Sequence, residues 1–287
     1  MKIAFWSEQE KVGTTFNMAA IACTAALVYP ISIGVVSSGY CDGDLEKNFQ
    51  KKRQSNGNTI MRRSSQANLE PADFLIAAEQ QEYFSDKGLD CLLRKEQEGD
   101  LEERLLRANM HPVIEEKLYC MPSSQRQEYK WWYKDRLFAQ MNRIVAMMEQ
   151  TFDAVLIDCG TRKDDFTRNI LQEADLCVLN MDQEAELIGD YYRTPPIFRG
   201  KTFFLVGNYF KDELYNRANL QRLYRMDEAM LGAVPYNPQM QAASTAGMMG
   251  IGIKKYIGHR LRGKNIDFEQ EITRTTRLIL KRAGVLE

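Results

Sequence analysis

Short apolar runs alternate with longer helical stretches along the chain, and this alternation predicts strands separated by helices. The run Lys2–Trp6 has the character of a buried strand, and the Ala-rich stretch Thr14–Val28, with Pro30 just past its end, predicts a helix. Further strands are predicted at 31–36, 118–121, 154–158, 176–180, 202–208 and 231–234, and further helices at 101–109, 134–150, 164–173 and 219–226.

This order of elements is typical of an α/β fold, a mostly parallel twisted sheet with helices on both faces. Ligands of such sheets bind at the carboxyl ends of the strands, so the loops after Trp6, Val36, Asp158, Asn180 and Asn208 are the predicted places for a functional site. A length of 287 residues is within reach of one α/β domain, and we expect a single domain over residues 1–287.

Residues 41–70 interrupt the pattern with a polar segment that carries two basic clusters. One interpretation is a solvated insertion, and the other is a contact surface for phosphate or for a partner. Near the C-terminus, residues 266–283 predict a helix with basic residues near its end. Its apolar face either docks on the domain, which we favour, or lies on a membrane surface. That face consists of Phe268, Ile272, Thr275, Ile279 and Ala283.

The composition excludes several classes of protein. Lys and Arg number 38 against 39 Asp and Glu, giving a formal net charge of −1, so the chain is not a globally basic nucleic-acid binder. Hydrophobic residues make up 44%, which argues against wholesale disorder. The 6 cysteines form no CxxC pair, which disfavours a zinc site and a disulfide framework. We therefore expect reduced thiols in a cytoplasmic protein.

The loop between the first strand and the first helix has the context of a phosphate-binding loop. Gly13 permits close approach of the backbone, and the hydroxyls of Thr14 and Thr15 lie at the start of the helix, where either caps it or contacts an anion or Mg²⁺. The segment is a poor match to the general Walker pattern, because it has one glycine and lacks the lysine before Ser or Thr.

This segment resembles the deviant Walker A motif of the MinD/ParA family, KGGVGKTT followed by a small, apolar helix. Val12 and Gly13 match the VG of the motif, and Thr15 matches its Mg²⁺-binding threonine. Gln9 stands in place of the signature lysine that reaches across the dimer, and Thr14 stands in place of the phosphate-binding lysine. The two glycines are replaced by Glu10 and Lys11.

Later segments resemble the same family in the same order. Residues 152–160 (FDAVLIDCG) resemble its Walker B strand, with Asp158 on the acidic position, and residues 174–180 resemble the strand that follows. Residues 205–208 resemble the strand whose terminal asparagine, here Asn208, reads adenine, and residues 231–237 resemble the segment beside the base. The resemblance covers nearly the whole chain and implies a P-loop NTPase fold of the MinD type.

After the second strand, the acidic residues depart from the pattern of the family. Ser38 stands where the family has an aspartate, and the catalytic candidates Asp42 and Asp44 follow a few residues later. These two carboxylates either supply the acids after a small insertion or belong to a turn of Gly and Asp.

The resemblance implies ATP or ADP bound with Mg²⁺, the metal being held at Thr15 and Asp158. The implied nucleotide-binding residues are Lys11, Val12, Gly13, Thr14, Thr15, Phe16, Asn208 and Pro235. A lost lysine–phosphate contact removes about 1.5–3 kcal/mol of binding, and a missing cation on the transferring phosphoryl group can cost about 10³–10⁵ in rate. We therefore expect weak or absent hydrolysis.

The resemblance further implies a positioning or regulatory protein that acts as a homodimer and localises a cellular machine through a protein partner. Members with decayed phosphate loops resemble the TadZ/CpaE type, which localises pilus or secretion machinery, and mobile-element apparatus is another such cargo. Recruitment to a membrane or cell pole would then come from partners. One alternative is an active ParA-type partitioning ATPase that binds DNA non-specifically. Another is a structural interaction module without nucleotide.

Overall fold

The computed structural model describes residues 1–38, 44–50, 88–99, 102–124, 134–184, 189, 201–257 and 264–287. These residues form an eight-stranded sheet in the order β3-β4-β2-β5-β1-β6-β7-β8. All neighbouring strands run parallel except β3 and β4, which are antiparallel. The strands are β1 (Lys2–Trp6), β2 (Ile33–Ser37), β3 (His111–Ile114), β4 (Leu118–Cys120), β5 (Ala154–Gly160), β6 (Leu176–Met181), β7 (Thr202–Tyr209) and β8 (Leu231–Pro235).

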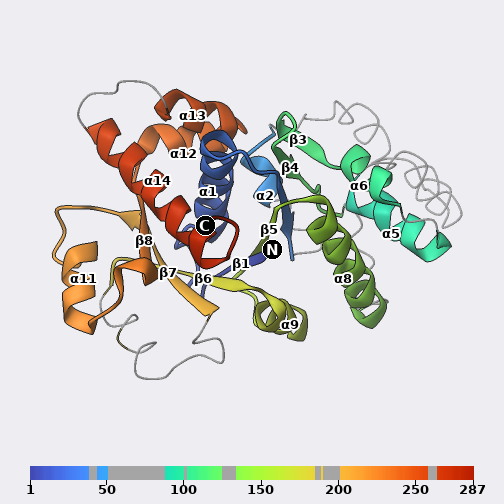
Figure 1. The fold of residues 1–287 in the computed structure, drawn as a ribbon, viewed down its shortest axis with the longest axis horizontal. Coiled ribbons are helices and arrows are strands. Elements are labelled where there is room, and N and C mark those ends of the chain that lie inside the picture. Colours follow the sequence, from blue (N-terminus) through green and yellow to red (C-terminus); the bar gives the residue numbers. More distant parts are fainter. Residues whose placement is uncertain are drawn as a thin grey trace, which may run out of the picture.

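Helices cover both faces of this sheet, so the predicted α/β architecture is confirmed (Figure 1). One face is covered by α1 (Thr14–Val28), α2 (Asp44–Lys47), α12 (Pro238–Thr245), α13 (Met249–Tyr256) and α14 (Lys264–Arg282). The other is covered by α5 (Leu89–Glu98), α6 (Glu103–Asn109), α8 (Lys134–Thr151), α9 (Asp165–Glu173) and α11 (Arg217–Tyr224). A 3₁₀ helix, η2, spans Glu228–Met230.

Strand side chains alternate between the two layers, as the pleat of a sheet requires. In β1, Ile3 and Phe5 belong to the hydrophobic cluster under α1, whereas Ala4 belongs to the cluster on the other face. In β6, Val178 belongs to the cluster under α1 and Cys177 to the cluster on the other face. The sheet is therefore buried on both sides, which explains why its strands read as continuous apolar runs in the sequence.

Several boundaries differ from the sequence-based expectation. The second strand begins at Ile33 rather than at residue 31, because the Ser32 N–H donates to the Asp153 carboxylate (2.7 Å) instead of joining the ladder. Residues 44–50, within the polar segment, are packed: Leu45 and Phe49 lie in the core against α1. The rest of the segment 41–70 lies outside the described residues. The sequence pattern did not predict α2, α5, β3, α12 or α13.

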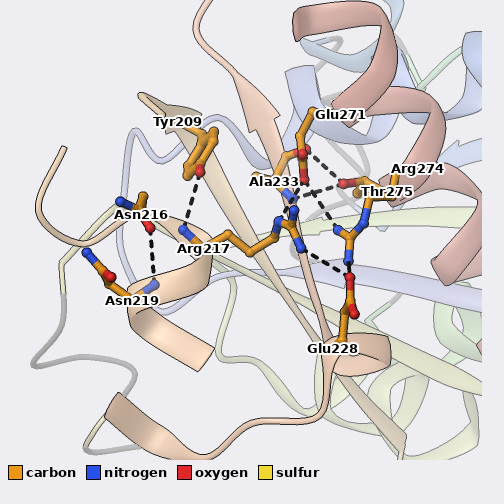
Figure 2. A network of polar contacts seen from close by, with 9 residues as sticks. All are labelled: Tyr209, Asn216, Arg217, Asn219, Glu228, Ala233, Glu271, Arg274 and Thr275. Carbon is orange, nitrogen blue, oxygen red and sulfur yellow. Dashed lines mark hydrogen bonds and ion pairs between the residues drawn. The ribbon is translucent and has the colours of Figure 1, made fainter. Parts of the chain in front are cut away.

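The C-terminal helix α14 is docked on the domain. Its apolar face is buried against α1 and β8, and Thr275 bonds the strand directly: its hydroxyl donates to the carbonyl of Ala233 and accepts from the N–H of Ala233, both at 2.9 Å. Beside this contact, Arg274 pairs with Glu228 (2.8 Å) and Glu271 (3.4 Å), and the network continues to α11 (Figure 2).

The two edges of the sheet are β3 and β8. Pro112 lies in β3, and Thr275 covers part of β8. Within the described part of the chain, every helix is too short or too polar to cross a bilayer.

Candidate functional site

The loop after β1 ends at a helix start that carries no side-chain cap. Gly13 precedes α1 in the left-handed conformation (φ 82°), and the first turn of α1 contains no acidic residue. The N–H of Asn17 makes the first helical bond, to the carbonyl of Gly13 (2.8 Å). The N–H groups before Asn17 have no partner within the helix, and together with the helix dipole they favour an anion at this end.

A buried amide pair and a close strand hold this loop in place. Asn17 Nδ2 donates to Asn180 Oδ1 at 3.1 Å, and the Asn180 amide in turn donates to the carbonyl of Trp6 (3.4 Å). From the other side β7 lies against the loop: a Cβ added at Gly207 would be 2.4 Å from the carbonyl oxygen of Val12 and 2.7 Å from Asn17 Nδ2. Only glycine fits at this point of closest approach.

Thr15 and Asp158, the two predicted metal ligands, lie together at the carboxyl end of β5. Asp158 is 4% exposed; its carboxylate accepts a hydrogen bond from the Gly160 N–H (3.0 Å) and interacts with the side chain of Thr15. Burial raises the pKa of Asp158 above its usual value; the interactions with Thr15 and with the Gly160 N–H oppose this shift, and the charge of Asp44 adds to it. Asp44 at the start of α2 is thus within electrostatic reach, whereas Asp42 lies outside the described residues.

The remaining predicted residues occupy the loop and the neighbouring strand ends. Lys11 is exposed with a positive φ of 65°, and the neutral side chain of Thr14 is buried. Val12 is buried and Phe16 is partly buried. Asn208 is exposed at the end of β7, one residue before Tyr209, which pairs with Pro235 at the end of β8. The topology therefore brings the adenine-side candidates to the same edge of the sheet as the loop.

The sequence-based prediction missed two features of this edge. The exposed rings of Phe210 and Tyr236 stack at 5.3 Å, directly after β7 and β8. Arg162, two residues after β5, donates from Nη1 to the hydroxyl of Ser38 (3.2 Å). The available signal was position: each of these residues follows closely on the end of a predicted strand, where sites of parallel sheets are built.

This set of donors suits a magnesium-bound polyphosphate. Backbone N–H groups at a helix start bind phosphate oxygens, and a hydroxyl beside a carboxylate offers the hard oxygen ligands that Mg²⁺ prefers. Within the loop, the side-chain oxygen of Gln9 is buried without a hydrogen-bond partner, an acceptor that a metal ion or a hydroxyl of a bound group can satisfy. The residues of the edge thus fit a nucleotide, with Thr14 providing no cation.

Solved structures with a similar fold were found, although no protein-family model and no curated protein matches the chain. A ParA family ATPase from Chlorobium tepidum TLS superposes with a TM-score of 0.62 at 11% identity, covering 96% of this chain and 98% of that one. The MinC:MinD cell division protein complex of Aquifex aeolicus superposes with a TM-score of 0.58 at 13% identity, covering 98% of this chain and 95% of that one. The septum site-determining protein MinD complexed with Mg-ADP from Pyrococcus horikoshii OT3 superposes with a TM-score of 0.60 at 12% identity, covering 99% of this chain and 98% of that one.

At these identities the likeness concerns the arrangement of the backbone, and it extends over nearly the full length of both chains in each case. The chain therefore has the fold of the MinD and ParA family of ATPases.

Proposed function

We propose that this chain is a MinD/ParA-like positioning or regulatory protein that binds ATP or ADP with Mg²⁺ at a degenerate site. The observation that carries this proposal is the contact of Thr15 with the buried Asp158 at the uncapped start of α1. A hydroxyl and a carboxylate in this position would hold the metal, while the first-turn N–H groups would hold the phosphates. When bound, the metal would neutralise phosphate charge.

The composition of the loop supports weak turnover. Thr14 and Gln9 stand where the resembled motif has its two lysines, and Lys11 is exposed. Each missing charge-assisted contact costs about 1.5–3 kcal/mol of binding. A cation on the transferring phosphoryl group is worth about 10³–10⁵ in rate. Backbone contacts retain part of the affinity, so we propose that this site still binds nucleotide but hydrolyses it weakly or not at all.

The same comparison supports a proposal about the partners of this protein. The Pyrococcus horikoshii neighbour holds Mg-ADP and the Aquifex aeolicus neighbour is complexed with MinC, a second protein. By analogy we propose that this chain acts as a homodimer and engages a protein of the machine that it localises, in the manner of the TadZ/CpaE type. Pilus, secretion or mobile-element apparatus are the cargo classes in question.

Calorimetry with Mg-ATP and Mg-ADP tests the site. Thr15→Ala is expected to weaken binding of both nucleotides, because it removes the metal-side hydroxyl, and Asn208→Ala to weaken both through the base. Thr245→Ala is the matched control, since the Thr245 hydroxyl only bonds the carbonyl of Gln241 within α12 (3.0 Å). Absence of binding at millimolar nucleotide would leave a structural interaction module and refute the proposal.

Sedimentation and turnover assays separate the alternatives. The proposal expects ATP to shift the monomer–dimer equilibrium while phosphate release stays near background. Rapid phosphate release, with DNA binding that weakens steeply as salt rises, would instead identify an active partitioning ATPase.

A further inference from the structure

Two aromatic rings stack at the carboxyl edge of the sheet with much of their surface open to solvent. Phe210 follows β7 and Tyr236 follows β8, and their ring centroids lie 5.3 Å apart with 28° between the ring planes. Phe210 is 48% exposed and Tyr236 42%. Single exposed apolar residues are common on protein surfaces, but a stacked pair at this edge offers a ligand a flat apolar surface. We call the pair Phe210 and Tyr236 the aromatic shelf.

Hydrogen bonds to the backbone hold the aromatic shelf in place. The side-chain amide of Gln183, after β6, donates to the carbonyl of Phe210 (2.7 Å) and accepts from its N–H (2.9 Å). The Tyr236 N–H donates to the carbonyl of Tyr209 (3.0 Å), and the Tyr209 hydroxyl accepts from the N–H of Arg217 at 3.3 Å (Figure 2). None of these bonds involves the two rings of the shelf. The shelf is therefore ordered before a ligand arrives, which lowers the entropic cost of binding.

The aromatic shelf lies near the phosphate-side loop and on the same face of the sheet. Gly207 approaches the carbonyl of Val12 in that loop, and Phe210 is three residues further on, so the Cα atoms of Gly207 and Phe210 are at most about 11 Å apart. Val234 belongs to the cluster under α1, and alternate residues of a strand share a face, so Tyr236 follows it on the side of α1. The shelf is thus within reach of a base whose phosphates lie at the start of α1.

We propose that the base of the bound nucleotide stacks on the aromatic shelf, and that the shelf makes the site prefer purine over pyrimidine nucleotides. This inference rests on the proposed nucleotide site. Stacking on an aromatic side chain is available to every base, because every base has an aromatic face. The apolar area buried grows with the size of the base, so a purine gains more from the shelf than a pyrimidine does.

Calorimetry of the full chain with Mg-ATP, Mg-CTP and Mg-tripolyphosphate provides the first test. The expected result is ATP binding about 5- to 20-fold tighter than CTP binding, a part of what one base–aromatic stack contributes. Equal affinities for ATP and CTP overturn the inference about the shelf and leave the proposed nucleotide site intact. Binding of neither ATP nor tripolyphosphate overturns the proposed function itself.

Variants then assign the preference to the ring. Phe210→Ala is expected to weaken ATP binding by about 5- to 150-fold, the range of one base–aromatic stack, while tripolyphosphate, which has no base, binds within about twofold of wild type. Phe210→Trp keeps a ring and is expected to retain the preference for ATP over CTP. Leu223→Ala is the matched control, because it removes an exposed apolar side chain from α11.

Two results with Phe210→Ala would overturn the inference. Unchanged ATP affinity would mean that the base does not contact the shelf. An equal loss of ATP and tripolyphosphate affinity would mean that the substitution displaces the phosphate-side loop, so that the ring has a structural role only.

Discussion

Replacing Gly207 by alanine tests the close packing of β7 against the phosphate-side loop. The backbone of Gly207 is not in the left-handed region, so an added Cβ causes no conformational strain of its own and the effect comes from space alone. Its nearest neighbour would be a backbone atom, the carbonyl oxygen of Val12 at 2.4 Å. Relief of that contact requires the loop itself to move by about 1 Å, toward ordinary van der Waals separation.

The loop has little freedom to make this movement. Val12 is 1% exposed, and the Asn17 amide that contacts its carbonyl is held by Asn180 at 3.1 Å. Overpacking of this kind costs about 1–3 kcal/mol. In a domain of this size each kcal/mol lowers the Tm by about 2–4 °C. Gly207→Ala is therefore expected to lower the Tm by about 2–12 °C and to weaken Mg-ADP binding, because the displaced segment leads into Gly13.

Gly250→Ala is the control, because it is expected to raise the stability of the fold rather than lower it. In α13 the added Cβ would meet Val113 Cγ1 at 3.5 Å, an ordinary contact, and alanine is preferred to glycine in a helix by about 0.5–1 kcal/mol. Urea and thermal unfolding of both variants, with calorimetry of Mg-ADP, measure the difference. If Gly207→Ala unfolds at the wild-type midpoint and binds as wild type does, the described contact between β7 and the loop is wrong.

Three further predictions concern other parts of the molecule. Thr275→Val removes both bonds to Ala233 and is expected to cost about 1–3 kcal/mol in urea unfolding; an unchanged midpoint would contradict the described docking of α14. Because burial raises the pKa of Asp158, the folded state keeps this proton at a higher pH than the unfolded chain does, and stability falls as the pH rises through that interval. Asp158→Asn should flatten this dependence, measured by urea unfolding below and above the ordinary carboxyl pKa of about 4; a profile identical to that of the wild type would exclude Asp158 as its source. Burial raises the pKa of the Cys159 thiol, so iodoacetamide should label partly exposed Cys91 well before Cys159, as read by peptide mass spectrometry, and equal rates would contradict the described burial.

Elements of the fold could be predicted from the sequence where burial leaves a clear hydrophobic pattern along the chain. The bounds of β1 and α1 agree with the prediction to the residue, because the strand is apolar on both faces and the helix is rich in small residues. Thr15 and Asp158 are brought to one edge, as the rule for parallel strands requires. In contrast, Pro112 obscures β3, and Gly250 and Gly252 obscure α13, because these residues are poor formers of either element.

The part of the site that was missed depends on long-range geometry. Arg162 lies in the polar stretch TRKDDF, which reads as an ordinary solvated turn. Its place is set by Gly160, whose positive φ of 54° turns the chain at the end of β5, and by Trp6 and Ser38, each more than a hundred residues away in sequence. No local pattern contains that information, since it arises only when β1, β5 and β2 pair in the sheet.

One blocked position on each edge of the sheet limits how copies of this protein can associate. Pro112 has no N–H to offer an incoming strand at β3, and at β8 the N–H and carbonyl of Ala233 are already bonded to Thr275. At these two positions an added strand would meet blocked or occupied backbone groups. Extension of the sheet from one molecule to the next, the route to fibrous aggregates, is therefore disfavoured there, and assembly is expected to proceed through side chains of loops and helices instead.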